Sequence, residues 1–463
     1  MQHATPTSLS PNAPNELWQL GPAARRMTVS GSVLAVAGLF GIAALIGGQS
    51  SLWFSLFAHA YLVAFTFYLS ITLGALFFVM LHHLSRAGWS VTLRRLAEAL
   101  SGNIGLMGLL FLMMLVLTRH GWTPEEDLRA ALQFGPSPMH PFVAIAMGVQ
   151  LDFTGLIVRF VIYFAVWLLL TWYLRSRSIR QDSSGDVSLS RAMERMSAFG
   201  MIAYALTITF AAVDLLMSLS PHWFSTIFGV YFFTGSVLSG LITLALLAFW
   251  LQANGRIGPA ITAEHYHDLG KLIFAFVFFW GYIAFSQYLL IWYANLPEET
   301  QFYMPRQIGP WAAVSIVLVV FHLLIPFVGL LSRHAKRRRR VLVFWAVWLL
   351  AAHLLDLFWL IMPNVYIEKI PEAVGAAPGT PLPEALKHLL ASPQAVYQLA
   401  QQHQGFMRAV EAPLEPRSLA ILLGMVLWMG GLYLLNTARL LRKAALVPVQ
   451  DPRLAESLAF ENL

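Results

Sequence analysis

Ten long apolar segments run through the sequence, separated by short stretches that hold most of the charged residues. Each segment is about 20 residues or longer, the length that a helix needs to cross the hydrocarbon core of a bilayer. We therefore predict ten membrane-spanning helices, numbered here as spans 1 to 10 in chain order. They lie near 28–48, 56–81, 97–117, 153–174, 196–219, 226–251, 269–293, 308–331, 341–361 and 418–438.

Composition supports the same conclusion. Of the 463 residues 58% are hydrophobic and only 11% are charged, whereas soluble domains carry about 25% charged residues. The sequence contains no cysteine, which excludes disulfides, thiolate-bound zinc, cysteine-held iron–sulfur clusters and thioether-attached haem. We expect an all-α integral membrane protein.

The basic residues predict how the helices are oriented. Most Lys and Arg residues fall in the tails and in alternate loops, with a dense run at 336–340. By the positive-inside rule, both termini are then cytoplasmic. The run at 336–340 is typical either of a topology anchor or of a site for anionic lipid or nucleic acid, and we interpret it as an anchor. The formal charge of +7 is explained by the membrane surface, with no nucleic acid partner.

A duplicated motif suggests an internal repeat. Asp214 lies seven residues before Pro221, and Asp356 lies seven residues before Pro363. Each motif ends the fourth helix of a four-helix unit, spans 2–5 and spans 6–9. An even number of helices in each unit makes the two copies parallel. The predicted units are a cytoplasmic N-tail 1–27, helix 1 with its loop 28–55, two four-helix bundles 56–225 and 226–361, an outer-face region 362–416, and helix 10 with a cytoplasmic C-tail 417–463, with helices 1 and 10 peripheral.

Ionisable side chains inside the spans are the first functional candidates. A carboxylate within a membrane helix is costly, so it normally faces protein or water and marks a proton or ion path. His353 precedes Asp356 by three residues and shares its helix face, and His322 lies four residues before Pro326, which loosens the local backbone. The alternative is that the two Asp residues are structural carboxylates that cap or pair within the bundle. The predicted proton path consists of Asp214, His322, His353 and Asp356, with an inner entrance at Glu264, His267 and Asp268.

A second group of polar residues is expected near the outer face. Arg159 in span 4 is a candidate partner for Asp152 or Asp214, most simply in a buried ion pair. His59 opens span 2, where we expect it at the membrane interface. The outer-face candidates are His59, Asp152, Arg159, His222, Glu298 and Glu299.

Metal and haem sites are not indicated. His265 and His267 are spaced as metal ligands, but no third ligand follows at a fixed spacing. Haem b requires paired His residues on facing helices, and no span carries two of His59, His322 and His353. An aromatic-lined pocket for a quinone ring stays open as an alternative.

Three stretches resemble a known family. Residues 214–231 place the Asp-bearing helix before Ser-Pro-His-Trp-Phe-Ser-Thr-Ile-Phe-Gly-Val-Tyr. Residues 264–300 begin Glu-His-Tyr-His-Asp-Leu-Gly-Lys and end Phe-Ser-Gln-Tyr-Leu-Leu-Ile-Trp-Tyr-Ala-Asn-Leu-Pro-Glu-Glu-Thr, and residues 160–182 run from Phe-Val-Ile-Tyr-Phe-Ala-Val-Trp to Arg-Gln-Asp. Together they resemble the NrfD-like membrane subunits of the polysulfide-reductase type, and most closely the ActF type of bacterial alternative complex III.

The resemblance implies a subunit of a respiratory quinol:electron-acceptor oxidoreductase in the bacterial cytoplasmic membrane. It implies as partners a second NrfD-like subunit, an iron–sulfur subunit, multihaem and monohaem cytochromes and a terminal oxidase. Haem and iron–sulfur clusters would then sit on the partners, quinol or menaquinol would be used by the complex, and this chain would bind no cofactor and conduct protons.

Two other functions remain open. One is a quinone-binding redox anchor like other members of the family, with quinol beside Asp214 or His59. The other is a stand-alone secondary transporter, favoured by the duplication and by polar groups near the membrane midplane. Against the transporter, the sequence shows no helix breakers at matching positions of both halves, apart from Pro326.

Overall fold

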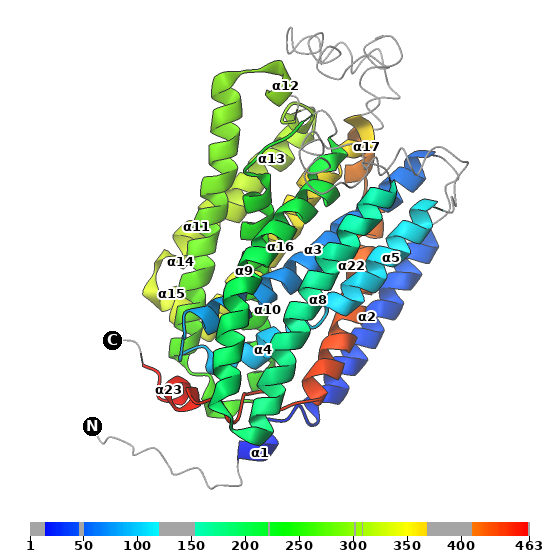
Figure 1. The fold of residues 1–463 in the computed structure, drawn as a ribbon. Coiled ribbons are helices and arrows are strands. Elements are labelled where there is room, and N and C mark those ends of the chain that lie inside the picture. Colours follow the sequence, from blue (N-terminus) through cyan, green and yellow to red (C-terminus); the bar gives the residue numbers. More distant parts are fainter. Residues whose placement is uncertain are drawn as a thin grey trace, which may run out of the picture.

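The computed structural model describes residues 14–45, 51–119, 153–220, 223–300, 302–307, 309–367 and 410–461. This part of the chain is helical throughout, with no strand (Figure 1). Its membrane-length helices are α2 (Ala23–Leu45), α3 (Ser51–Leu84), α8 (Phe153–Ser184), α9 (Val187–Leu215), α10 (Phe228–Ala253), α11 (Ala263–Ala294), α16 (Arg339–Ile361) and α22 (Pro416–Arg442). Two further spans are built from pairs of shorter helices, α4 (Val91–Ser101) with α5 (Ile104–Arg119) and α13 (Trp311–Val319) with α14 (Ile325–Leu331).

The ten predicted spans are confirmed. Ten helical segments of the described chain are long and apolar enough to cross a membrane, and each one overlaps a predicted span. The remaining helices are short connectors, namely α1 (Pro14–Leu17), α12 (Pro297–Thr300), α15 (Arg333–Arg337), α17 (Asn364–Ile367) and α23 (Leu454–Leu458). The protein is a multi-pass, all-helical membrane protein.

Helices α3 and α10 form the centre of the bundle and touch along glycines. A Cβ atom on Gly74 would lie 1.9 Å from the backbone oxygen of Ser236, and one on Gly240 would lie 2.6 Å from the carbonyl carbon of Gly74. Only glycine permits this approach, which is the usual way in which membrane helices come close together. Around this pair α3 also packs against α4, α9, α16 and α22, and α10 also packs against α9, α11 and α16. The two central helices are the first helices of the two predicted four-helix units, and the repeat itself stays a prediction.

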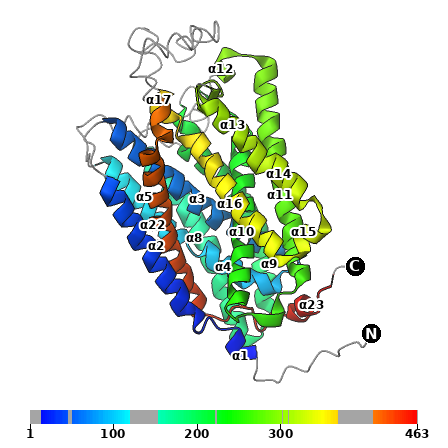
Figure 2. The same cartoon turned by 180° about the vertical axis from the view of Figure 1, so that it is seen from behind.

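Helices α2 and α22 pack against each other at one edge of the bundle (Figures 1 and 2). A Cβ atom on Gly38 would lie 2.4 Å from the backbone nitrogen of Trp428, and one on Gly431 would lie 2.3 Å from that of Ala35. The outer face of α2 carries exposed apolar side chains such as Phe40, which is 71% exposed. Span 1 and span 10 therefore form one peripheral pair that is joined to the bundle mainly through α3.

The third span differs from its prediction. It begins at Val91 and is broken between α4 and α5, where the amide of Asn103 donates 3.1 Å to the carbonyl oxygen of Leu100 and 2.9 Å to the hydroxyl of Thr437. Every residue of α4 is buried, including Arg94 and Arg95, which the prediction placed in a loop. The prediction searched for stretches without charged residues, so the predicted span began only after these arginines. In the folded protein, buried acidic partners allow both arginines to lie within the helix.

The eighth span is interrupted by a π-helical turn, η4 (Val320–Leu324), between α13 and α14. Pro326 follows one residue after this turn, behind Ile325, and has no backbone N–H to donate to the preceding turn. The expected loosening of the helix at this place is thus confirmed, and it falls on His322. Such π-turns occur frequently at functional sites.

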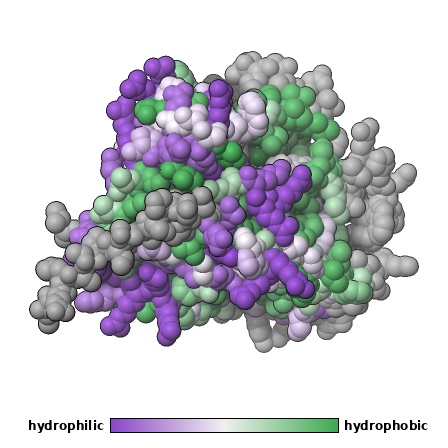
Figure 3. Space-filling view, turned by 90° about the horizontal axis from the view of Figure 1, so that it is seen from below, coloured by the Kyte–Doolittle hydropathy of each residue, from purple (hydrophilic) through white to green (hydrophobic). Residues whose placement is uncertain are grey.

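The two ends of the bundle differ in chemistry. The end that carries α1, α23 and both described termini shows broad hydrophilic areas when it is viewed from below (Figure 3). It includes α15 and the start of α16, which contain Lys336, Arg337, Arg338, Arg339 and Arg340. This is the end that the distribution of Lys and Arg predicts to be cytoplasmic.

Candidate functional site

Asp214 is held in a buried ion pair near the end of α9. Its Oδ2 accepts hydrogen bonds of 2.8 Å from Nε of Arg159 and 2.8 Å from the hydroxyl of Tyr163, both on α8, and its Oδ1 lies 3.2 Å from a terminal nitrogen of Arg159. The Asp214 side chain is 4% exposed and that of Arg159 is 6% exposed. Of the two partners predicted for Arg159, the structure shows Asp214. Two charge-assisted hydrogen bonds from one guanidinium hold the carboxylate in one orientation.

Asp356 has a different environment on α16. Its Oδ1 accepts a short hydrogen bond from the hydroxyl of Tyr231 on α10, and its Oδ2 accepts one of 3.2 Å from the indole N–H of Trp280 on α11. Asp356 is 2% exposed. Within the described ranges, no Lys, Arg or His forms an ion pair with it. A buried carboxyl with only neutral donors is the kind that can exchange a proton without breaking an ion pair.

His353, on the same helix as Asp356, contacts the centre of the bundle. It lies one helical turn before Asp356, and its Nε2 is 2.9 Å from the hydroxyl oxygen of Ser70 on α3. Ser70 is in turn 3.2 Å from the hydroxyl of Ser239 on α10. The other ring nitrogen of His353 is buried and has no hydrogen-bond partner. Polar contacts of these three side chains thus join α16, α3 and α10, while the two hydroxyls donate to the carbonyl oxygens of Phe67 and Ser236 on their own helices.

His322 adds a second unsatisfied imidazole to this group. It is 0% exposed, and neither of its ring nitrogens has a hydrogen-bond partner. Its ring centre lies 3.8 Å from that of Trp280 and 6.4 Å from that of His353. Unpaired buried polar groups cost about 1–3 kcal/mol each, so their retention needs an explanation. We refer to Asp356, Tyr231, Trp280, His322, His353, Ser70 and Ser239 as the Asp356 cluster.

The structure brings together three of the predicted path residues and separates the fourth. His322, His353 and Asp356 share the Asp356 cluster, whereas Asp214 is bound by α8. Sequence reasoning missed Tyr231 and Trp280 as partners of a carboxylate. Both lie in the stretches that carry the family resemblance, but spacing along one helix does not show which residues of other helices face it.

The predicted inner entrance lies elsewhere on α11. Glu264 pairs with Arg337, and Asp268 pairs with Lys271 at 2.5 Å. His265 serves the helix itself, because its ring completes the capping box with Thr262 at the start of α11. Trp280 follows Asp268 by twelve residues, roughly 18 Å along the helix. His267 is 7% exposed, and in the described part of the chain no group of three His, Asp or Glu residues is arranged to hold a metal ion.

The outer-face candidates are only partly described. His59 is buried within the protein, at 1% exposure, and its Nδ1 lies 2.7 Å from the carbonyl oxygen of Ser55 one turn earlier, while its position at the membrane interface stays a prediction. Glu299 lies in the short helix α12. Asp152, His222 and the side chain of Glu298 lie outside the described residues.

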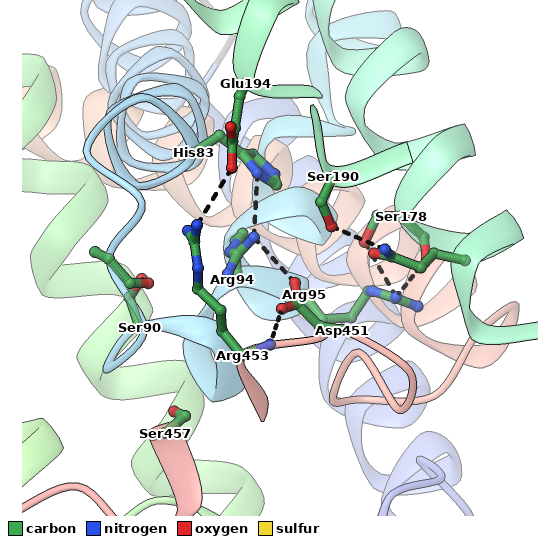
Figure 4. A network of polar contacts seen from close by, with 12 residues as sticks. His83, Ser90, Arg94, Arg95, Ser178, Ser190, Glu194, Asp451, Arg453 and Ser457 are labelled. Carbon is green, nitrogen blue, oxygen red and sulfur yellow. Dashed lines mark hydrogen bonds and ion pairs between the residues drawn. The ribbon is translucent and has the colours of Figure 1, made fainter. Parts of the chain in front are cut away.

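A second buried polar network, at the end of the bundle with the termini, was not predicted at all (Figure 4). Arg94 on α4 lies 3.1 Å from Nδ1 of His83 and 3.2 Å from a carboxylate oxygen of Asp451 in the C-terminal segment. Arg95 pairs with Asp182 at 2.8 Å and with Glu98 at 3.1 Å. The signal available in the sequence was the pair of arginines beside an apolar segment, which is indistinguishable from a topology marker.

The C-terminal segment joins this network to α11. The hydroxyl of Ser457 on α23 lies 3.2 Å from that of Thr92 on α4 and 3.2 Å from Nε2 of His265 on α11. It also donates to the carbonyl oxygen of Trp89 at 2.7 Å. The segment therefore acts as a structural strap across one end of the bundle.

Neither the protein-family models nor the curated proteins compared with this sequence match it. The resemblance to NrfD-like subunits therefore stays a prediction that rests on the three stretches quoted from the sequence.

Proposed function

We propose that this chain is an integral subunit of a bacterial respiratory quinol:electron-acceptor oxidoreductase of the alternative complex III type, in which it carries protons through the membrane. It would lie in the cytoplasmic membrane with both termini in the cytoplasm, beside a second NrfD-like subunit and redox subunits that hold the haem and iron–sulfur clusters. In this proposal the chain performs no electron transfer of its own.

The observation that carries the proposal is the contrast between the two buried aspartates. Asp214 has a guanidinium against it, so protonating it would break an ion pair. Asp356 receives only neutral hydrogen bonds, from Tyr231 and Trp280. A proton-carrying carboxyl must be able to exist in both forms, and Asp356 is the one whose partners permit this. Asp214 is then a structural group, and the path prediction is narrowed to the Asp356 cluster.

The neighbouring groups supply steps for a proton. His353, Ser70 and Ser239 form a series of polar contacts, and the hydroxyls of Ser70 and Ser239 donate to the carbonyl oxygens of Phe67 and Ser236. A proton passes along this series when a hydroxyl turns from its carbonyl oxygen to its neighbour in the series. His322 and the free nitrogen of His353 provide three polar atoms around which water can be held, and a buried water typically makes about three hydrogen bonds. The series begins at His353, one turn before Asp356 on α16, and ends in the contact between α3 and α10.

The proposal is tested by isolating the tagged chain in a mild detergent and by assaying the eluate for a haem spectrum, quinol oxidation and proton release in vesicles. Red, quinol-oxidising material with several partner chains supports the respiratory complex. In that material, Asp356→Asn is expected to lower the number of protons released per quinol while quinol oxidation continues. Colourless, solitary protein contradicts the proposal.

A secondary transporter is the second candidate, and the broken third span favours it. Transporters build their substrate sites from discontinuous helices, and α4 and α5 are separated at Gly102 and Asn103. This break falls on the second helix of the first predicted unit, whereas the π-turn falls on the third helix of the other unit. The two interruptions are thus not at matching positions. Substrate uptake by vesicles that contain only this chain would favour the transporter over the respiratory subunit.

A further inference from the structure

A cavity of about 360 Å³ lies where the peripheral pair α2 and α22 meets the rest of the bundle. Its buried floor includes Phe67 of α3, Leu100 of α4 and Tyr433 of α22. The volume falls within the range of about 300–1,000 Å³ that ligand pockets occupy. The Asp356 cluster lies behind the floor, because the Phe67 ring is 5.9 Å from that of His353. None of the predicted site residues lines the cavity.

The rim of the cavity is formed by side chains that are only partly buried or exposed. Leu34 of α2, Leu246 of α10 and Leu350 of α16 are partly buried, and Ser30 of α2 is exposed. The cavity therefore opens sideways, between α2 and the pair α10 and α16. Because these helices are membrane spans, this opening faces the bilayer, and a molecule enters it from the lipid.

The chemistry of the lining excludes most polar ligands. Most of the lining is Leu, Ile, Val, Met or aromatic, the exceptions being Ser30, Thr243, Gly430 and Thr437. The hydroxyls of Tyr68 and Tyr433 are already donated to the carbonyl oxygens of Val426 and Leu100. The hydroxyl of Thr243 is buried without a partner. Such a cavity stabilises a flexible apolar chain and offers little to a charged or highly polar group.

A basic group stands at one end of the cavity. Met27 and Ser30 lie on the first turns of α2, directly after Arg26, and Trp250 lies on the last turn of α10, one turn before Asn254. The guanidinium of Arg26 is exposed and donates 2.6 Å to the side-chain oxygen of Asn254, which links the ends of these two helices. Basic groups beside a cleft between membrane helices are typical sites for anionic lipid head groups.

We propose that this cavity binds one acyl chain of an anionic phospholipid, with the lipid phosphate at Arg26. The bound chain fills the space between the α2–α22 pair and the central helices α3 and α10. Beyond this space, the pair contacts the bundle mainly through α3. The lipid thereby completes the packing behind Phe67 and stabilises the attachment of the peripheral pair. This inference is independent of the proton path and of any redox partner.

The experiment is native mass spectrometry of the purified, delipidated full chain, with dioleoyl-phosphatidylglycerol or dioleoyl-phosphatidylcholine added back. Wild-type protein is expected to retain one phosphatidylglycerol at least several-fold more strongly than phosphatidylcholine. Ser30→Trp, which fills the mouth, is expected to lose that lipid. Val33→Trp is the matched control, because Val33 is 60% exposed on the same helix and does not line the cavity.

Three further variants keep the test decisive. Leu246→Trp fills the cavity from α10 and is expected to act like Ser30→Trp, while Arg26→Gln removes the preference for phosphatidylglycerol and Arg25→Gln preserves it. Equal lipid retention by wild type, Ser30→Trp and Leu246→Trp overturns the proposal. So does a quinone, instead of a phospholipid, as the molecule that co-purifies with wild type and is lost from both filled variants.

Discussion

Arg159 and Asp214 form a two-pronged ion pair inside the bundle, with Nε to Oδ2 at 2.8 Å and a terminal guanidinium nitrogen to Oδ1 at 3.2 Å. The sequence-related Asp356, seven residues before a proline as Asp214 is, has Tyr231 and Trp280 in place of a cation. The same motif thus ends in two different environments. The environment of Asp214 suits a permanently charged carboxylate, and that of Asp356 suits a carboxyl group that binds and releases a proton.

Removing Arg159 alone should destabilise the protein strongly. Arg159→Met leaves an ionised carboxylate buried without its cation, which typically costs about 3–5 kcal/mol. The double variant Arg159→Met, Asp214→Leu removes both charges and should recover most of the loss, because apolar replacements of buried pairs are often close to neutral. Thermal unfolding in detergent measures both. Additive destabilisation by the two substitutions would show that the pair is not coupled.

The two Asp→Asn substitutions should differ in stability. Asp214→Asn leaves Arg159 buried without an anion, at a cost of about 3–5 kcal/mol. Asp356→Asn keeps an acceptor for one of its two donors and loses about one neutral hydrogen bond, about 1 kcal/mol. Comparing the unfolding midpoints of the two purified variants tests this order. An Asp356→Asn variant as unstable as Asp214→Asn would show that Asp356 has a structural charge partner.

Helix α2 offers a matched pair of glycines. Gly38→Ala places a Cβ 2.4 Å from the backbone nitrogen of Trp428, whereas at Gly41 the nearest atom is the Cα of Gly424 at 3.9 Å. Overpacking of this kind costs about 1–3 kcal/mol, so Gly38→Ala should lower the unfolding temperature and Gly41→Ala should leave it nearly unchanged. If both variants lower the unfolding temperature equally, the close contact of α2 and α22 does not lie at Gly38.

The C-terminal segment should contribute to stability through one carboxylate. Asp451→Ala removes the anion that lies 3.2 Å from Arg94 while both side chains are 5% exposed. Breaking such a buried pair typically costs about 3–5 kcal/mol. Glu461→Ala, at an exposed position of the same segment, is the control and should behave as wild type. Chemical unfolding followed by tryptophan fluorescence distinguishes the two, and equal stability would show that the strap does not hold α4.

The hydrophobic pattern was sufficient for the ten spans, because twenty apolar residues have few alternatives to crossing a bilayer. It failed at Arg94 and Arg95, where burial is made possible by Glu98 on the same helix and by Asp182 and Asp451 from distant parts of the chain. The local pattern does not show the two distant partners, Asp182 and Asp451.

For the site, the sequence identified the buried ionisable groups but not the residues of other helices that contact them. Asp356 and His353 share a face by their spacing, which was predictable. That Ser70, Tyr231 and Trp280 face them depends on how three other helices pack. The prediction of one path through both aspartates treated the two carboxylates as equivalent. The structure distinguishes them, because Arg159 lies against Asp214 and no such cation lies against Asp356 among the described residues.

The most direct test of the account is infrared spectroscopy of the purified protein between acidic and alkaline pH. The account predicts a carboxyl band from the protein interior that changes with pH in wild type, is lost in Asp356→Asn, and persists when Arg159 and Asp214 are replaced together by Met and Leu. If that band survives in Asp356→Asn and disappears with the Arg159–Asp214 replacement, Asp214 is the proton-exchanging group and the central claim is wrong.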